Sequence, residues 1–300
     1  MNVLICICAS NRPILLQKTL NSFKNLKIPD TVNLIIYLID NNIHKKNKII
    51  YQKFKNEKKF KLFYSYELKK GIVHARNNFL NKLKFLKIRV DYIGFTDDDC
   101  IIPNYWLQNH MKTFKSYNCD ISTGPQKIKK STKHIEQMYY LMNKKIKNDL
   151  TKTNWAATNN VILKYSILKK EKLEFDINLN EVGGSDQLFF SILSRKGAQI
   201  IWNNNACVIE NLKFKRMNEK WFSKRNIRYG YSNSYMNKII YGSFNGFFMS
   251  ILKYFYLVTQ MVKVFLLKNY YKNNYLYDMY KFRAQGLLRY YFGKKVKKYY

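Results

Sequence analysis

The sequence predicts an α/β protein in which a mostly parallel central sheet is flanked by helices. Two observations support this fold class. Residues 2–8 and 32–39 form nearly continuous apolar runs, which is typical of strands covered on both faces. Helical segments with one apolar side separate such runs, so strands and helices alternate over the first hundred residues. After about residue 240, the chain adds a helical appendage.

The first hundred residues supply this alternation in order. Pro13 suits the first turn of a helix after the first strand, and Ser10 or Asn11 can cap that helix. Asp40 closes the second strand. The expected elements are strand 2–8, a helix from Pro13, strand 32–39, a basic helix to about 58, strand 60–66, helix 71–86 and strand 92–96.

After Pro103 the pattern mixes helices and short strands. No internal repeat or low-complexity linker interrupts it, so we expect one domain over 1–240 and a basic, aromatic tail over 241–300. The expected elements are helix 105–117, a strand and turn at 121–125, an apolar segment ending at 163, a helix from Tyr165, a helix from Ser185 to Arg195, and strands 199–202 and 206–209.

The composition is typical of a folded protein with a large apolar core and many basic residues. Hydrophobic residues make up 47% of the 300 residues, enough for a substantial core. The net charge of +35 predicts attraction to nucleic acid, anionic lipid or a phosphorylated substrate, or reflects a coding bias that also enriches Asn, Ile and Tyr. Five scattered Cys without a Cys-x-x-Cys pair argue against disulfides and structural zinc. Residues 1–9 are too short for a signal-peptide core and are interpreted as a strand.

Three consecutive carboxylates, Asp97, Asp98 and Asp99, follow the short strand 92–96. Ligands of open α/β sheets bind at the carboxyl ends of strands. Side chains alternate along an extended segment, so Asp97 and Asp99 share a direction and Asp98 points away. Oxygen ligands favour Mg²⁺ or Mn²⁺, commonly held by one or two carboxylates and substrate phosphates. The run therefore predicts either a cation site or a solvated acidic turn.

Six segments follow one another in order over residues 2–235: the opening strand and loop 5–13, the strand end 38–41, a Gly-x-x-x-Ala-Arg-Asn helix start at 71–77, an Asp-x-Asp segment at 95–99 with Pro103 and Trp106, Gly183 to Gln187, and Trp221 with Arg225, Arg228 and Gly230. Together these segments resemble family 2 glycosyltransferases of the GT-A fold. One departure concerns Ser185, which stands where the family usually has Glu before Asp186, so the acceptor geometry is expected to differ.

This resemblance implies transfer of a sugar from a nucleotide-diphosphate sugar, a UDP-sugar in the first place, to an acceptor hydroxyl, with inversion. It implies a nucleotide-sugar-binding part over 1–106 and an acceptor-binding part over 107–240. Mn²⁺ or Mg²⁺ would be held by Asp97 and Asp99, with Asp99 the direct ligand and Asp97 alternatively on the ribose or sugar. The residues expected at the nucleotide sugar are Ser10, Asn11, Arg12, Asp40 at the base, Arg76, Asp97 and Asp98.

Asp186 is the candidate general base, because it lies at the start of a helix behind two glycines. A simple helix-terminal charge is the alternative. Trp221, Arg225 and Arg228 share one helical face at i, i+4 and i+7. We expect them to clamp the diphosphate or an anionic acceptor, with a solvated basic face as the alternative. The four His residues show no metal or triad spacing.

The tail contains an amphipathic helix at 247–267. Lys253, Gln260 and Lys263 lie opposite its apolar stripe, and two lysines within 21 residues argue against a membrane span. We expect contact with the anionic inner face of the cell membrane in the cytoplasm, or packing on the catalytic domain. The stripe is Phe247, Phe248, Ile251, Tyr254, Phe255, Val258, Met261, Val262, Phe265 and Leu266, and the basic flank is Lys272, Lys281, Arg283, Arg289, Lys294, Lys295, Lys297 and Lys298.

A membrane-associated transferase would act in surface polysaccharide or lipid-linked glycan synthesis. The alternative function is a non-catalytic basic protein that binds membrane or nucleic acid, although no nucleic-acid-binding module is recognisable and we expect no nucleic-acid partner. A nucleotidyltransferase would need a glycine-rich loop after the first strand, and Ala9 to Pro13 contains no glycine.

Overall fold

A computed structural model describes residues 1–129, 131–143, 148–211, 218–267, 275–294 and 296. The chain forms two compact units. The first comprises Met1–Lys129, Ile146–Ile177 and Ser185–Asn211, and the second comprises Lys130–Lys145, Asn178–Gly184 and Leu212–Tyr300.

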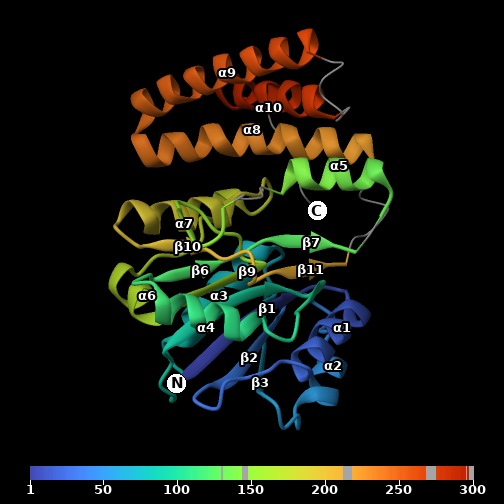
Figure 1. The fold of residues 1–300 in the computed structure, drawn as a ribbon, viewed down its shortest axis with the longest axis vertical. Helices are drawn as coiled ribbons and strands as arrows, with labels where there is room; N and C mark the ends of the chain where they lie inside the picture. Colours follow the sequence, from blue (N-terminus) through green and yellow to red (C-terminus); the bar gives the residue numbers. More distant parts are fainter. Residues whose placement is uncertain (130, 144–147, 212–217, 268–274, 295, 297–300) are drawn as a thin grey trace. The chain divides into compact units, whose positions relative to one another are not determined.

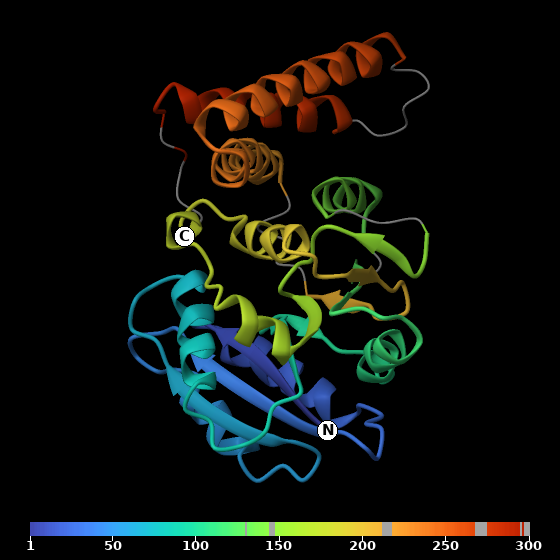
Figure 2. The ribbon, with the colours of Figure 1, turned by 90° about the vertical axis from the view of Figure 1, so that its left-hand side faces the viewer.

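The first unit is built on an eight-stranded sheet with the order β3-β2-β1-β4-β9-β6-β10-β8 (Figure 1). Its β3-β2-β1-β4 part is parallel, and these strands lie side by side in Figure 2. The mostly parallel sheet predicted from the sequence is thus confirmed. The strands are β1 Asn2–Ala9, β2 Asn33–Asp40, β3 Lys61–Tyr66, β4 Tyr92–Asp97, β6 Ile121–Thr123, β8 Thr151–Thr153, β9 Asn160–Lys164 and β10 Ile200–Trp202.

A smaller sheet with the order β5-β11-β7 lies next to the acidic segment. Its strands are β5 Cys100–Ile101, β7 Gln126–Ile128 and β11 Val208–Glu210. β11 runs antiparallel to β5, and the backbone N–H of Asn211 donates to the carbonyl of Asp99 at 2.8 Å. The sequence analysis placed a late strand at 206–209 but did not predict its pairing beside the aspartates.

Side chains of β1 alternate between two apolar cores, which explains its unbroken apolar sequence. Leu4 and Cys6 join Val73 and Phe79 on one face, whereas Ile5 and Ile7 join Leu16, Leu20 and Trp106 on the other. Both faces are therefore covered, as predicted. The covering helices of this unit are α1 Pro13–Lys24, α2 Lys48–Phe54, α3 Ile72–Leu83, α4 Trp106–Ser116, α6 Tyr165–Glu171 and α7 Ser185–Arg195.

A buried polar network fixes β9 beside the end of β4, where Thr96 pairs with Asn160. The Asn160 side chain accepts from Trp106 Nε1 at 2.7 Å and donates to the carbonyls of Pro125 and Ala206 at 3.1 and 2.7 Å. His110 is fully buried against it, and burial lowers the pKa of His110 to about 3. His110, which the sequence left unassigned, is a neutral part of this structural network.

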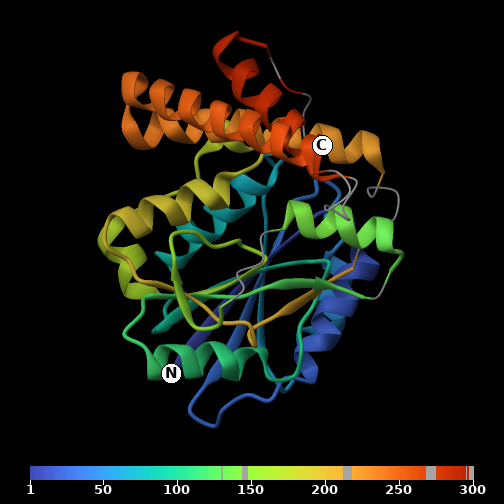
Figure 3. The same cartoon turned by 45° about the horizontal axis from the view of Figure 1, so that its top comes forward.

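The second unit consists of α5 Lys133–Met142, α8 Glu219–Tyr241, α9 Ser243–Leu266 and α10 Leu276–Tyr291. The last three lie side by side (Figure 3). α8 and α10 approach closely at two glycines: a Cβ added to Gly230 would lie 2.0 Å from the carbonyl oxygen of Arg283, and one added to Gly286 would lie 2.0 Å from that of Ile227. Contact between helix backbones through small residues is common in membrane proteins.

The predicted boundary at residue 240 differs from the division between the units, because α8 packs with α9 and α10. The predicted tail helix is present as α9. Among the described residues α9 is the one helix whose length and composition would let it cross a membrane. Four residues of the expected basic flank lie outside the described residues: Lys272, Lys295, Lys297 and Lys298.

Candidate active site

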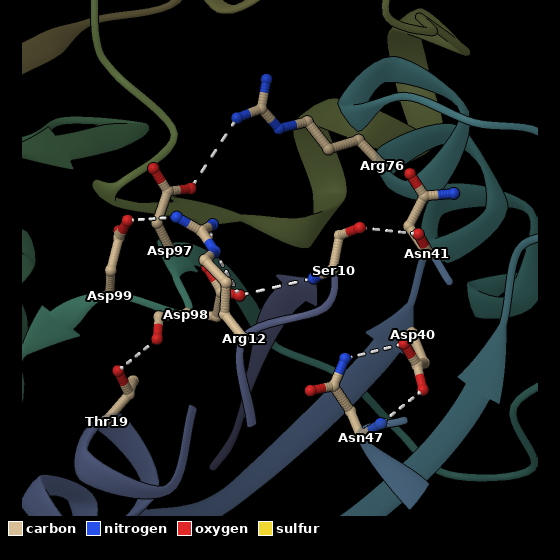
Figure 4. Close-up of polar contacts among 10 residues, drawn as sticks. All are labelled: Ser10, Arg12, Thr19, Asp40, Asn41, Asn47, Arg76, Asp97, Asp98 and Asp99. Carbon is tan, nitrogen blue, oxygen red and sulfur yellow. Dashed lines mark hydrogen bonds and ion pairs between the residues drawn. The ribbon is translucent and has the colours of Figure 1, made fainter. Parts of the chain in front are cut away.

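The site forms where the parallel strands end together. In the register of the sheet, Ala9 of β1 pairs with Asp40 of β2, and Cys8 pairs with Asp97 of β4. The loops that follow these strands therefore meet at one edge (Figure 4). Ser10 links two of them, since its hydroxyl donates to the carbonyl of Asn41 at 2.9 Å. The aspartates lie at the edge where an open sheet binds ligands.

Arg12 is the central cation of this edge. Its Nε donates to Asp98 Oδ2 at 3.0 Å, and its terminal nitrogens form ion pairs with Asp98 Oδ1 and Asp99 Oδ2. The guanidinium thus spans two of the three carboxylates (Figure 4). A planar fork of five N–H donors suits carboxylates and phosphates equally. Arg12 was predicted to lie at the nucleotide sugar, whereas its pairing with the aspartates was not predicted.

Asp98 points into the protein, as the alternation of side chains predicted. Its side chain has no exposed surface, and its carbonyl accepts from Thr19 of α1 at 3.0 Å. Burial raises the pKa of Asp98 to about 7, while Arg12 acts in the opposite direction. Asp98 therefore anchors Arg12 and the loop after β1.

Asp97 faces the opposite side and is the most accessible of the three, with 35% of its side chain exposed. Arg76 of α3 lies 3.9 Å from Asp97 and donates to the Ser185 hydroxyl at 3.4 Å. Desolvation and the charge of Asp99 raise the pKa of Asp97 to about 6, against the opposing effect of Arg76. Ser185, the departure from the family pattern, therefore contacts the arginine beside the acidic segment.

Asp40 holds the loop that follows β2. Its side chain is fully buried and accepts from the Asn47 backbone and amide at 3.1 and 2.8 Å, and from the Tyr64 hydroxyl at 3.1 Å. Burial raises the pKa of Asp40. In this structure the carboxylate fastens the loop after β2 and offers no surface to a ligand. The contact of Asp40 with a nucleotide base stays a prediction.

Asn41, which the sequence analysis did not single out, holds the loop that leads into α3. Its amide nitrogen donates to the carbonyls of Glu67 and Lys69 at 2.9 and 2.8 Å, and its amide oxygen accepts from Gly71 N–H at 2.8 Å. Gly71 has a φ of 128°, which a glycine adopts readily. The position of Asn41, directly after a predicted buried strand, was the sequence feature that could have identified it as a loop-holding residue. Asn41 positions the start of the helix that carries Arg76.

The remaining predicted residues divide between the two units. Asn11 is exposed with a φ of 51°, a left-handed conformation that Asn tolerates. Asp186 lies in the first turn of α7, next to Ser185, and accepts from Gln187 N–H at 3.0 Å. Trp221, Arg225 and Arg228 belong to α8 of the second unit.

The carboxylates fit a cation that a substrate helps to hold. Among the described residues no cluster of three or more His, Cys, Asp or Glu side chains would enclose a metal by itself. Asp97 is accessible, and Asp99 has one oxygen on Arg12, which leaves its second oxygen for another ligand. Two carboxylates completed by phosphate oxygens and water are a usual Mg²⁺ or Mn²⁺ environment.

Comparison with solved structures identifies the fold. Residues 1–349 of S. aureus TarS align with a TM-score of 0.57 at 14% identity, covering 98% of this chain and 92% of that one. Full-length TarS aligns with a TM-score of 0.55 at 14% identity. This alignment covers 98% of this chain and 55% of the TarS chain. A Pyrobaculum calidifontis mannosyltransferase, PcManGT, in complex with GDP-Man and Mn²⁺, gives 0.64 at 12% identity, covering 98% of this chain and 88% of that one. TarS 1–349 has also been solved with UDP and with UDP-GlcNAc.

Sequence comparison identifies the family. A search of curated proteins gives no significant match. Residues 4–174 match glycosyl transferase family 2, and this range contains most of β1, the acidic segment and the helix that carries Arg76. The chain belongs to glycosyl transferase family 2 and is a glycosyltransferase of the GT-A fold.

Proposed function

We propose that this enzyme transfers a sugar from a nucleotide-diphosphate sugar, a UDP-sugar in the first place, to an acceptor hydroxyl, and that it depends on Mn²⁺ or Mg²⁺. One observation carries the proposal: Asp97 and Asp99 lie at the carboxyl edge of the sheet with two arginines beside them. The structural neighbours solved with UDP, UDP-GlcNAc, or GDP-Man and Mn²⁺ support the same donor class.

The chemical difficulty is the negative charge that grows on the departing diphosphate. Asp97 and Asp99 would hold a divalent cation, which when bound would supply Lewis-acid stabilisation of that charge. Arg12 and Arg76 border the same carboxylates, so their guanidinium groups can donate to phosphate oxygens that approach Asp99 or Asp97. Ser10 and Asn11 complete the loop after β1 on the nucleotide side.

Asp186 is proposed to take the proton from the attacking acceptor hydroxyl. Its carboxylate lies in the first turn of α7, directly after Ser185, which contacts Arg76 beside the acidic segment. A single base acting on the acceptor, with the diphosphate leaving from the opposite face of the sugar, gives inversion.

The acceptor is proposed to be a glycan or lipid-linked glycan, reached by peripheral contact with the inner face of the cell membrane. α9 packs through Gly246, Ser250, Leu257 and Val264, none of which belongs to its apolar stripe. The exposed side chains of this helix include Phe244, Phe247, Phe248, Phe255, Phe265 and Leu266. Such a surface, on a chain of net charge +35, suits an anionic bilayer.

The membrane contact is tested by sedimenting the full chain with vesicles. We expect binding to phosphatidylcholine vesicles that contain phosphatidylglycerol. Phe248→Glu combined with Phe255→Glu should weaken this binding about tenfold or more, since each change removes exposed apolar area that the bilayer would bury. Binding that is equal for wild type and this variant would contradict the proposed contact. A concentration-dependent dimer that loses its association in the variant would instead assign the face to a second copy of the chain.

The transferase proposal is tested by incubating the protein with UDP-, GDP- and dTDP-sugars and Mn²⁺ and measuring release of the nucleotide. We expect one donor class to be hydrolysed slowly without an acceptor, and chelation by EDTA to abolish the release. Release from every donor at the same rate, with or without EDTA, would contradict it. The Asp186→Asn variant serves as a second test, since it should lower transfer to the acceptor while the affinity for nucleoside diphosphate stays unchanged.

A further inference from the structure

The second unit carries a cluster of arginines at the edge between α8 and α10. At the glycine contact, the carbonyl of Arg283 meets Gly230, so the α10 backbone touches α8 at the residue directly after Tyr229. The side chains of Arg225, Tyr229 and Arg283 consequently gather on one edge. The guanidinium carbons of Arg225 and Arg283 each lie 5.4 Å from the centre of the Tyr229 ring.

Arg283 has only neutral partners in the part of the chain that the structure describes. Its Nε donates to Asn226 Oδ1 at 2.9 Å, and one terminal nitrogen donates to the carbonyl of Leu141 at 3.2 Å. Within the described residues no carboxylate lies within ion-pair distance of it. Burial lowers the pKa of Arg283, and the charge of Arg225 acts in the same direction. An arginine nevertheless stays charged in a protein, so Arg283 is a partly buried cation that the described residues do not pair with a carboxylate.

Arg225 is held in place on the same ring. Its Nε and a terminal nitrogen donate to the Tyr229 hydroxyl at 3.1 and 2.9 Å, and it lies over Trp221 with its guanidinium carbon 5.0 Å from the ring centre. The Tyr229 hydroxyl in turn donates to the Met142 carbonyl at 3.4 Å. Aromatic stacking and hydrogen bonds thus fix two guanidinium groups next to each other, although their charges repel.

We infer that Arg225 of α8 and Arg283 of α10, which both contact the Tyr229 ring, form an anion site. This site takes a phosphate group of the acceptor. The inference rests on the proposed transferase function and names the acceptor class as phosphorylated. Two ordered guanidinium groups match the oxygens of a phosphate, and both side chains are partly exposed. The exposed apolar face of α9 in the same unit favours a phosphate carried on a lipid chain over a soluble one.

The experiment titrates the full chain with farnesyl phosphate in neutral detergent micelles and, separately, with inorganic phosphate. We expect Arg283→Gln to weaken farnesyl phosphate binding about ten- to hundredfold, because one charge-assisted hydrogen-bonding group is lost. Arg289→Gln is the matched control: it removes the same charge from the same helix and should change the affinity less than about threefold. Arg283→Lys keeps the positive charge but loses the planar set of guanidinium donors, so its affinity for farnesyl phosphate should lie between those of the wild type and Arg283→Gln.

Several outcomes would overturn the inference. Equal losses for Arg283→Gln and Arg289→Gln would show non-specific charge attraction, and unchanged binding in Arg283→Gln at a wild-type unfolding temperature would exclude the site. A loss of affinity for phosphatidylglycerol vesicles but not for farnesyl phosphate would assign the cluster to lipid headgroups. Tighter binding of farnesyl phosphate than of inorganic phosphate supports an acceptor whose phosphate is carried on a lipid chain. Equal affinities for the two would contradict a lipid-borne acceptor.

UDP binding in the same samples separates this inference from the proposed function. If UDP with Mn²⁺ binds the wild type and Arg283→Gln equally, the donor site is independent of Arg283, as we expect. If UDP binding falls in Arg283→Gln, the cluster holds the donor diphosphate and the acceptor assignment is wrong. If UDP fails to bind the wild type at all, the transferase proposal itself fails, whatever the result with farnesyl phosphate.

Discussion

Asp99→Asn is expected to lower the turnover of the best donor about a thousandfold. A metal ion in such a site contributes several kcal/mol to the transition state, and each ~1.4 kcal/mol corresponds to a factor of ten in rate. Asn replaces a charged cation ligand by a weaker neutral one, yet it keeps an oxygen for Arg12. The measurement is the steady-state rate with saturating Mn²⁺, together with the unfolding temperature.

Asp30→Asn is the control for this change, because Asp30 is an exposed carboxylate in the turn before β2, away from the strand ends that carry the site. It removes the same charge and should leave the rate within about twofold, as expected for a surface substitution. A rate for Asp99→Asn within tenfold of the wild type would contradict the role of Asp99 as direct ligand. The same result would leave Asp97 as the principal carboxylate to examine.

Gly286→Ala is expected to destabilise the helical unit by about 3 kcal/mol, at the upper end of the usual range for overpacking. In an exposed helix the same change would stabilise by about 1 kcal/mol, so the sign itself is informative. The added Cβ would lie 2.0 Å from the carbonyl oxygen of Ile227 and 2.9 Å from the Cα of Gly230. Both contacts are with backbone, which cannot rotate away, so α8 and α10 must separate.

Gln285→Ala is the neighbouring control, since Gln285 is exposed on the same helix and should tolerate the change. The measurement is amide hydrogen exchange of α8 and α10, which reports the stability of this unit separately from the sheet. Faster exchange in both helices for Gly286→Ala, with wild-type exchange in β1 and β2, is the expected pattern. Unchanged or slower exchange would contradict the close backbone contact.

The parallel half of the sheet could be predicted from the sequence because its pattern is local. β1 is apolar on both faces, and a strand buried on both sides in a parallel sheet needs such a run. The acidic segment follows β4, and the position of Asp98 follows from the alternation of side chains. These features depend on neighbouring residues along the chain and on one general rule about where strands end.

The partners of the site residues could not be predicted in the same way. Arg12 and Asp98 are 86 residues apart in the chain, and several basic side chains were possible partners. The hydrogen bonds of Asp40 with Asn47 and Tyr64 join residues that are 7 and 24 positions apart, and no sequence motif marks these two as its partners. The contact of α8 with α10 depends on two glycines whose importance appears only when the helices cross.

The most direct test of the account compares the stabilisation of the wild type by UDP in Mn²⁺ and in EDTA. A ligand that binds only the folded state at about one hundred times its Kd adds ~2.7 kcal/mol to the unfolding free energy. We predict a clear rise in unfolding temperature with UDP and Mn²⁺, a much smaller rise with UDP and EDTA, and loss of this difference in Asp99→Asn. An identical rise with and without the metal would contradict the claim that these aspartates hold a cation for the departing diphosphate.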